Sequence, residues 1–265
     1  MVHTFELTSV GARAVVDLAG GRLASLQIGG LELLITEGAK PTRWGSFPMA
    51  PWAGRLPFGK LHFQGQVYDF PITSPPHANH GTSHLQDWTR LDDRTIHTEL
   101  VAPWPFGGHV RQTFDLVELS STEGSLTIAI SVHADDQPMP ALAGWHPWFR
   151  RQLDRGEPAL LIVDPGAAYE MDESMIPTGR LVNPPPPPWN ECFVNLAADP
   201  LIRWIGAVDL RVSSSFDHWV VFTEPEHAIC VEPQSGPPNQ INTQPFIVTP
   251  GAPLTGSMTL SWTLH

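Results

Sequence analysis

The sequence has few cysteines, few basic residues and no long apolar run, and each shortage argues against a class of protein. Its 265 residues include two cysteines, Cys192 and Cys230, which are too few for a disulfide framework and lack C-x-x-C spacing. No apolar run approaches the roughly 18 residues that a membrane-spanning helix needs. The 15 basic residues against 27 acidic ones give a net charge of −12, so we expect neither a nucleic-acid nor a membrane partner.

The first residues also lack the features of an export signal. The stretch 1–6 has no basic segment and no apolar segment behind it. We therefore expect a soluble, cytoplasmic protein.

A sustained helical period is absent as well, and proline and glycine are abundant. The 28 prolines and 22 glycines interrupt helices and favour short strands joined by turns. Alternating apolar residues predict strands at 3–8, 12–18, 21–28, 31–35, 61–70 (a hairpin), 95–101, 109–119, 125–133, 159–164, 201–212, 219–223, 229–232 and 257–264. Strand patterning resumes on both sides of the proline run 184–188, which is typical of a stiff surface connection. We predict one all-β domain over residues 1–265.

One stretch does not fit this pattern. Residues 43–60 combine prolines and glycines with aromatic side chains, which indicates an irregular loop. A free loop would expose those aromatic side chains to water at a cost, so we expect it to pack against the domain or to line a pocket.

The sequence around His146 is the first candidate for chemistry. A histidine can give or take a proton near neutral pH without special tuning. Trp145 and Trp148 flank it, and their faces could stack on the C–H side of a sugar ring, as could those of Trp44 and Trp52. The alternative is a buried aromatic cluster with a hydrogen-bonded histidine.

Glu232 and Arg55 are the candidate charged partners. Glu232 closes the apolar strand 228–231, where partial burial would raise its pKa toward the range of a general base. Arg55 could bind a sugar hydroxyl or pair with a carboxylate. Glycoside hydrolysis would require a second carboxylate. Asp87 and Asp217 are candidates for it, and the spacing selects neither.

His77, His80 and His84 raise the alternative of a metal site. Such a site needs three or four ligands converging at about 2 Å, and this run offers no paired H-x-H and no cysteine. We favour His80 alone, held by the turn at Gly81 and donating a hydrogen bond into a pocket.

Five short motifs, in this order, resemble the aldose 1-epimerase (galactose mutarotase) family. They are Phe47-Pro48 with Gly54-Arg55 and Gly59-Lys60, Asn79-His80-Gly81, Gly144 to Phe149, Ile176 to Gly179, and Glu232-Pro233 with Pro238-Asn239. The resemblance implies an all-β, galactose-mutarotase-like β-sandwich (supersandwich) with a sugar bound in an open cleft on one sheet.

The resemblance also implies roles for individual residues. His146 would be the acid at the ring oxygen and Glu232 the base, with His80 as a second catalytic histidine and Arg55 as a sugar ligand. The other implied sugar contacts are Asn79, Asn190, Trp145 and Trp148. Members of the family often carry an aspartate where this chain has Asn190, so the preferred sugar could differ; Asp217 is a possible substitute.

The predicted function is therefore that of an isomerase which interconverts the anomers of a hexose. Deprotonating the C1 hydroxyl while protonating the ring oxygen opens the ring, and reclosure on the other carbonyl face gives the second anomer. This chemistry requires no metal and no organic cofactor. The partner would be a small sugar, and the protein a monomer or homodimer.

Three alternatives remain open. A hexose-6-phosphate 1-epimerase would need a basic cluster at the cleft mouth, for which Arg43, Arg90, Arg150 and Arg151 are available. A non-catalytic sugar-binding module would bind without accelerating anomer exchange. A metal-dependent enzyme would use the histidine run 77–84.

Overall fold

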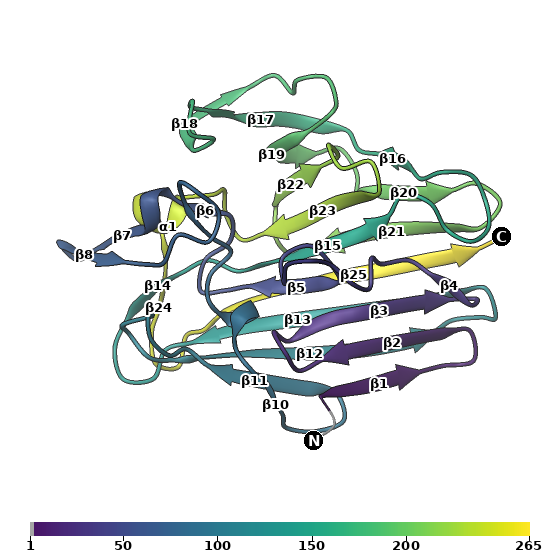
Figure 1. Ribbon diagram of the computed structural model, residues 1–265, viewed down its shortest axis with the longest axis horizontal. Coiled ribbons are helices and arrows are strands. Elements are labelled where there is room, and N and C mark those ends of the chain that lie inside the picture. The colour runs from purple at the N-terminus through teal and green to yellow at the C-terminus, as the bar shows by residue number, and fades with distance from the viewer. Residues whose placement is uncertain (1–2) are drawn as a thin grey trace.

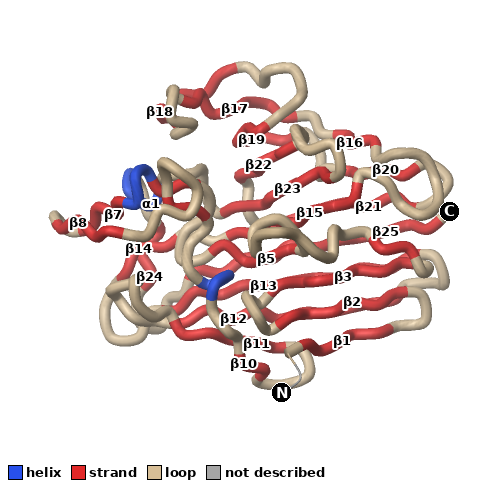
Figure 2. The backbone as a smooth tube through the Cα atoms, in the orientation of Figure 1, coloured by secondary structure: helices blue, strands red, loops and turns tan. Residues whose placement is uncertain are grey.

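Strands make up almost all of the regular secondary structure in the computed structural model, which describes residues 3–265 (Figures 1 and 2). Two large antiparallel sheets stack on each other and enclose one apolar core, which confirms the predicted β-sandwich. The helical segments of residues 3–265 are single turns: η1 (Pro57–Gly59), η2 (Ser83–Leu85) and α1 (Gln240–Thr243). None of the helices described is long and apolar enough to cross a membrane.

The first sheet carries eleven strands. In spatial order they are β1 (Thr4–Thr8), β2 (Ala12–Asp17), β3 (Arg22–Ile28), β5 (Ser46–Met49), β15 (Gly144–Arg150), β23 (Ala228–Gln234), β22 (His218–Phe222), β19 (Asn190–Leu196), β17 (Pro165–Met171) and β18 (Pro177–Val182), with β4 (Leu31–Glu32) paired to β3. The centre of this sheet is thus assembled from strands far apart in the sequence.

The second sheet has eight strands. Their order is β10 (Thr89–Arg90), β11 (Thr95–Glu99), β12 (His109–Glu118), β13 (Glu123–His133), β25 (Leu254–Leu264), β21 (Val208–Ser214), β20 (Leu201–Trp204) and β16 (Leu160–Ile162). Three short pairs lie outside both sheets: β6 (Arg55–Leu56) with β9 (Ala78–Asn79), β7 (Lys60–Phe63) with β8 (Gln66–Asp69), and β14 (Met139–Ala141) with β24 (Phe246–Val248).

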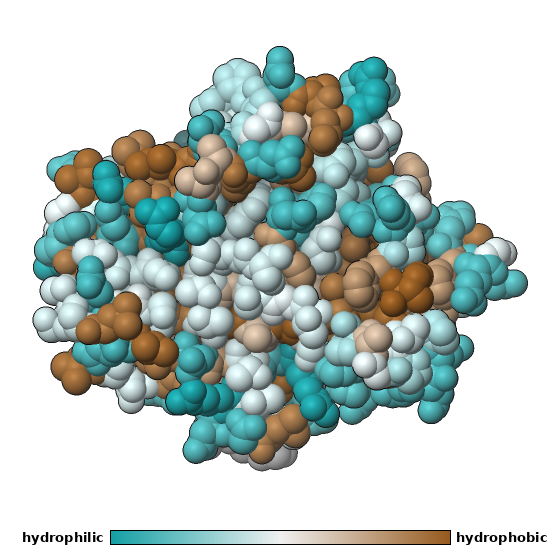
Figure 3. All heavy atoms as spheres, turned by 180° about the vertical axis from the view of Figure 1, so that it is seen from behind, coloured by the Kyte–Doolittle hydropathy of each residue, from teal (hydrophilic) through white to brown (hydrophobic). Residues whose placement is uncertain are grey.

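The longest strands of the second sheet show why alternation predicts them well. Leu126 and Ile128 of β13 face the core opposite Leu260 and Met258 of β25, and burying each such side chain stabilises the fold by about 1.5–3 kcal/mol. The intervening residues point outward, where hydroxyls pair across the strands. The molecule seen from behind is correspondingly pale and weakly polar across its middle (Figure 3).

The central strands β15 and β23 of the first sheet do not alternate, because both of their faces are covered. Residues 144–149 and 228–234 are all buried. One face packs on the core between the sheets. The other carries a small apolar cluster, formed by Phe47, Met49, Ala53, Trp148, Ala228 and Cys230.

The prediction of an irregular loop at 43–60 is only partly right. Residues 46–49 form β5, a buried strand between β3 and β15, and the rest covers the outer face of the sheet. The sequence did not predict this strand because Pro48 lies within it. A proline cannot donate a ladder hydrogen bond, but here it faces Trp145 on one side, while β3 pairs with β5 only at Ser46.

Other elements differ from the predictions in smaller ways. The stretch 201–212 is two strands, since a turn at 205–207 separates β20 from β21. The hairpin β17–β18 was not predicted. The proline run 184–188 does lie at the surface, where it joins β18 to β19.

Candidate active site

A cavity of about 400 Å³ opens over the central strands of the first sheet. Strands β15, β19, β22 and β23 provide its floor, and the covering segments provide its walls. It is lined by Lys40, Thr42, Arg43, Gly54, Arg55, Thr73, Ser74, Pro75, Asn79, His80, His146, Trp148, Asn190, Val220, Phe222, Glu224, Glu232, Gln234 and Pro238. The volume suits a small polyol, and most of the lining is polar.

His146 and Glu232 meet on this floor. The register that pairs Gly144 with Gln234 and Trp148 with Cys230 sets His146 opposite Glu232 on neighbouring strands. The Nε2 atom of His146 lies 3.2 Å from the Oε1 atom of Glu232, and both side chains are almost fully buried. A histidine and a carboxylate are therefore in contact on the two central strands of the sheet.

Aromatic rings fix the orientation of the His146 imidazole. The ring stacks on Trp148 at 5.1 Å between centroids and on Phe47 at 5.0 Å. These contacts leave the edge with Nε2 facing Glu232 and keep water from the ring. Burial lowers the pKa of His146 to about 3, with a smaller contribution from the nearby Arg43 cation.

Burial acts on Glu232 in the opposite direction, because it disfavours the charged form of either group. It raises the pKa of Glu232 well above its usual value, while Arg55 and a hydrogen bond from Gln234 partly oppose the rise. Burial thus favours the neutral imidazole and the neutral carboxylic acid, an arrangement with one proton in the pair.

His80 lies beside this pair and lines the cavity. Its ring meets that of His146 edge-on at 5.2 Å, and its Nδ1 atom is buried without a partner among the described residues. Burial lowers its pKa well below the usual value, so His80 is a neutral hydrogen-bonding group. Its backbone has φ of 66°, and the Gly81 turn follows with φ of 72°.

The other two histidines of the run turn to different partners. The Nε2 atom of His77 contacts the carbonyl of Ser174 at 2.8 Å, and the Nδ1 atom of His84 contacts the carbonyl of His80 at 3.1 Å. The three imidazoles do not converge on one point, which removes the structural basis of the histidine-run metal site.

Arg55, Asn79 and Asn190 form one wall of the cavity. Arg55 on β6 pairs with Asn79 on β9, and its guanidinium donates to the Met175 carbonyl at 3.2 Å and to the Asn190 side-chain oxygen at 3.5 Å. Because Arg55 occupies that oxygen, the amide nitrogen of Asn190 is the group left to meet a ligand. All three residues line the cavity, and their contact with a sugar stays a prediction.

The predicted tryptophan contacts need a correction. Trp148 lines the cavity, although His146 covers one of its faces. Trp145 is fully buried and donates its indole N–H to Gln112 at 3.0 Å, so it belongs to the core and does not contact a sugar. Successive residues of a strand point to opposite faces, and His146 already occupies the cavity face. Trp44 and Trp52 are also absent from the lining.

The proposed second carboxylates do not reach the cavity. Asp217 is bound at the surface to its neighbour His218, with 2.7 Å between Oδ1 and Nδ1, and Asp87 belongs to a bridge with Ala19. Glu224 lines the cavity and was not foreseen, nor were Lys40, Gln234 and Phe222. No sequence motif marked them: Gln234 and Phe222 lie at strand ends, Glu224 follows β22, and Lys40 lies in the loop between β4 and β5.

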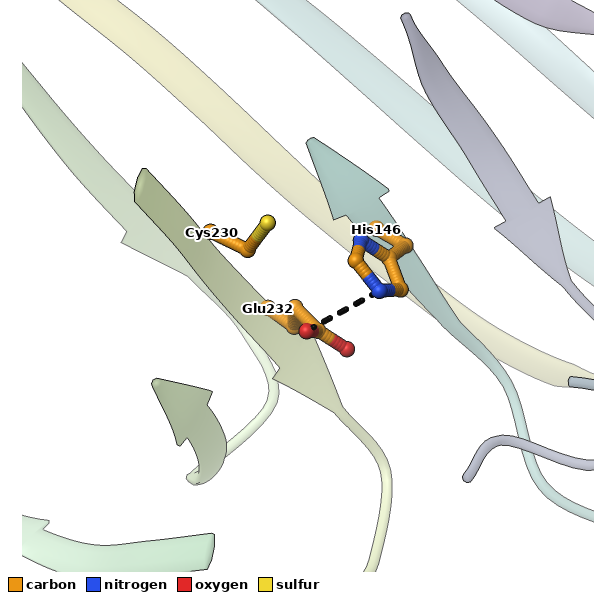
Figure 4. Close-up of side chains that lie close together, drawn as sticks. All are labelled: His146, Cys230 and Glu232. Atoms are coloured by element: carbon orange, nitrogen blue, oxygen red, sulfur yellow. Dashed lines mark ion pairs between the residues drawn. The ribbon is translucent and has the colours of Figure 1, made fainter. Parts of the chain in front are cut away.

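One group of side chains in the described part of the chain could hold a metal ion. It consists of His146, Cys230 and Glu232, whose ligand atoms all lie within 4.8 Å of one another (Figure 4). Cys230 and Glu232 project from β23 on the same face, toward His146 on β15. The cysteine spacing had given no sign of this arrangement.

Comparisons with known proteins agree with this architecture. The curated protein YihR of Escherichia coli K12, described as uncharacterized, is 25% identical over 188 residues; the match spans 66% of this chain and 59% of YihR. A candidate aldose 1-epimerase from the same organism superposes with a TM-score of 0.82 at 18% identity, over 99% of both chains. A galactose mutarotase-like protein from Clostridium acetobutylicum gives a TM-score of 0.81 at 17% identity, over 98% of this chain and 95% of that one.

The chain also matches a protein family as a whole. The sequence model of the family "Aldose 1-epimerase" matches residues 3–261, nearly the whole chain. The chain therefore belongs to the aldose 1-epimerase family.

Proposed function

We propose that the protein is an aldose 1-epimerase that interconverts the α and β anomers of a hexose. The observation that carries the proposal is the 3.2 Å approach of His146 Nε2 to Glu232 Oε1 on the floor of a polar cavity. Both oxygens that must exchange protons, the C1 hydroxyl and the ring oxygen, are bonded to the same sugar carbon. An acid and a base that serve them have to lie close together, as this pair does.

In the proposed reaction Glu232 removes the proton of the C1 hydroxyl while His146 protonates the ring oxygen. The C1–O5 bond breaks with its electron pair going to O5, and C1 becomes the aldehyde carbon. Rotation about C1–C2 followed by reclosure on the other face gives the second anomer. On reclosure the two groups exchange roles, so both regain their starting protonation.

One proton in the pair is enough for this cycle. In the free protein burial favours the arrangement with that proton on Glu232. The Arg55 cation favours the carboxylate, and sugar hydroxyls would add further hydrogen bonds to it. Transfer within the pair then gives the carboxylate and the imidazolium that ring opening uses.

The remaining polar wall suits the sugar hydroxyls. Arg55, Asn79 and His80 offer donors at one side of the cavity. Asn190 offers an uncharged amide where other family members often present a carboxylate, so we expect a hydroxyl there to act as acceptor.

The test is polarimetry on freshly dissolved α-D-glucose and α-D-galactose, with and without protein. Glu232→Gln and His146→Asn should each lower the catalysed rate by roughly 10²–10⁴-fold, because each removes one proton transfer. Glu226→Gln and His62→Asn are matched controls at exposed positions and should keep the full rate. Rates near wild type in either active-site variant would refute the mechanism. Sugar binding by the wild type without acceleration would indicate a non-catalytic binding module.

A second candidate substrate is a hexose 6-phosphate, and one observation favours it. Lys40 and Arg43 line the cavity, and neither has an ion-pair partner within residues 3–265. The four-arginine cluster considered from the sequence does not form. Arg90 pairs with Asp93, while Arg150 and Arg151 bind the backbone carbonyls of Leu34 and Thr223.

Comparing the two substrates separates these candidates. A 6-phosphate substrate predicts a higher kcat/KM on glucose 6-phosphate than on glucose, and a selective loss of that preference in Arg43→Gln. Equal or lower rates on the phosphate would leave the neutral hexose as substrate.

A further inference from the structure

A thiol lies beside the acid/base pair, and the proposed reaction does not use it. Cys230 is fully buried on β23, two residues before Glu232 and directly opposite Trp148. Its sulfur faces the same space as the imidazole of His146 and the carboxylate of Glu232 (Figure 4). We call these three side chains the His-Cys-Glu triad.

We propose that the His-Cys-Glu triad is a binding site for a thiophilic divalent cation of the zinc type, and that such an ion inhibits the enzyme by occupying its acid and base. Imidazole nitrogen, thiolate and carboxylate are the three ligand types that zinc prefers. Magnesium and calcium prefer oxygen ligands, so the triad should discriminate against them.

The spacing of the triad is close to what a tetrahedral ion needs. Bonds of about 2.0–2.3 Å place the ligand atoms about 3.3–3.6 Å from one another. His146 Nε2 and Glu232 Oε1 already stand 3.2 Å apart, and no pair of ligand atoms in the triad exceeds 4.8 Å. Closing the widest gap takes a movement of about 1 Å, within the reach of side-chain rotation.

The charges of the triad also balance those of a dication. The entering ion displaces the thiol proton of Cys230 and the proton held by the His146–Glu232 pair, and both go to solvent. The resulting carboxylate and thiolate supply two negative charges, and the neutral imidazole supplies none, so the occupied site is uncharged. A buried site tolerates an uncharged complex far better than a lone ion. Arg43 and Arg55 stand near the site, and their charges favour an ion held by two anionic ligands over one held by neutral ligands.

The cavity supplies access and the fourth ligand. His146 and Glu232 line its floor, so an ion entering from solvent meets them first, with the thiol behind them. Water could complete the coordination from the open side. An ion held in this way removes both proton-transfer groups from the substrate, so its binding should compete with that of the sugar.

The inhibitory part of this inference rests on the proposed function, whereas the binding part does not. Cobalt(II) is the probe for binding, since a thiolate bound to cobalt gives a charge-transfer band in the near ultraviolet. The wild-type protein should show this band on titration with cobalt, and zinc should displace cobalt and abolish it.

Two cysteine variants locate the site. Cys230→Ser should lose the band and weaken zinc binding by about tenfold or more, since even outer-shell changes cost 10–100-fold in affinity. Cys192→Ser is the matched control, because Cys192 is equally buried but lies outside the triad, and it should keep the band. In the polarimetric assay zinc should inhibit the wild type and Cys192→Ser reversibly on addition of a chelator, and magnesium should not.

Several results would overturn the proposal. They are cobalt binding without a thiolate band, a band that survives in Cys230→Ser, and the absence of binding at millimolar metal. If Cys230→Ser does not fold, X-ray absorption on the zinc-loaded wild type decides the matter, because it should show one sulfur at about 2.3 Å. A thiolate band in a protein that does not accelerate mutarotation would refute the proposed function and leave the metal site standing.

Discussion

At the scale of single residues, environment separates the proposed catalytic pair from its nearest chemical equivalent. His218 and Asp217 are also a histidine and a carboxylate in contact, 2.7 Å apart. The Asp217 side chain is 87% exposed, so water screens its charge and the pair does little beyond local structure. His146 and Glu232 are buried at the floor of a cavity, so a proton can pass between them without exchanging with bulk water.

The first prediction concerns the pH dependence of this pair. The proposed reaction requires one proton in this pair, so activity should be lost when a second proton enters or the only one leaves. The lowered pKa of His146, about 3, and the raised pKa of Glu232 place these two events far apart. We expect kcat/KM, corrected for the uncatalysed reaction, to show no acid limb near 6.5, the usual pKa of a histidine. It should fall as pH rises through the raised pKa of Glu232.

The measurement is polarimetry across this range, with circular dichroism at each pH as the control for acid unfolding. An acid limb near 6.5 with the fold intact would show that His146 titrates like an exposed imidazole.

The second prediction concerns Gln234. Its amide nitrogen lies 3.4 Å from Glu232 Oε2, its own oxygen has no partner among the residues described, and the side chain is fully buried at the cavity. Gln234→Leu should lower kcat about 10–100-fold, since a hydrogen bond to a charged group contributes about 1.5–3 kcal/mol. It should also move the alkaline limb upward, because the bond from Gln234 lowers the pKa of Glu232.

Gln66→Leu, at an exposed position of β8, is the matched control and should leave both quantities unchanged. A loss of kcat without movement of the limb would indicate a structural role for Gln234.

At the scale of elements, the sequence correctly predicts strands that have one solvent-exposed face. The alternation in β12 and β13 locates them to within two residues. Strands that are covered on both faces show no such alternation. The sequence pattern therefore does not predict β5 and does not indicate which residues of β15 face the cavity. His146 could be chosen from its residue type and motif. Telling Trp145 from Trp148 also required knowing that residues 144–150 form a strand, in which Trp148 shares the face of His146 and Trp145 does not.

The third prediction belongs to the turn that holds His80. A Cβ atom on Gly81 would lie 2.1 Å from the Ala50 carbonyl oxygen, which already accepts the N–H groups of Thr82 and Ser83. Gly81→Ala should therefore destabilise the protein by more than the 1–2 kcal/mol that a left-handed backbone costs alanine. It should also lower kcat/KM by displacing His80.

Gly65→Ala measures the stability cost of the left-handed backbone alone, since Gly65 has a similar φ of 76° and open space around it. Thermal unfolding and polarimetry on both variants make the comparison. Equal losses of stability, with activity kept in each, would show that the contact with Ala50 is unimportant.

At the scale of the whole molecule, the fold must support a buried acid at its centre. A carboxyl group whose pKa is raised in the folded state contributes full stability below its unfolded value, 4.5, and that contribution is lost as pH rises toward the folded value. The site therefore costs stability as pH rises above 4.5.

The fourth prediction follows from this cost. Glu232→Gln cannot ionise, so its melting temperature should exceed that of the wild type by an amount that grows as pH rises above 4.5. Each kcal/mol corresponds to about 2–4 °C for a chain of this size. Glu226→Gln should follow the wild type at every pH. A constant difference between Glu232→Gln and the wild type would show that Glu232 titrates alike in the folded and unfolded chains.

The cavity is built from strands of the sheet, which form its floor, and from covering segments, which form its walls, and this division affects how the protein could change its substrate. The two groups proposed to transfer protons, His146 and Glu232, lie on central strands that are buried on both faces. The cations of the cavity and most of the groups proposed to bind hydroxyls come from the segments that cover these strands. Grafting a different cover onto the same floor should give a new preference with the same ring-opening chemistry. A laboratory search for new sugars would therefore do best to randomise residues 40–43 and 73–75 and leave the floor alone.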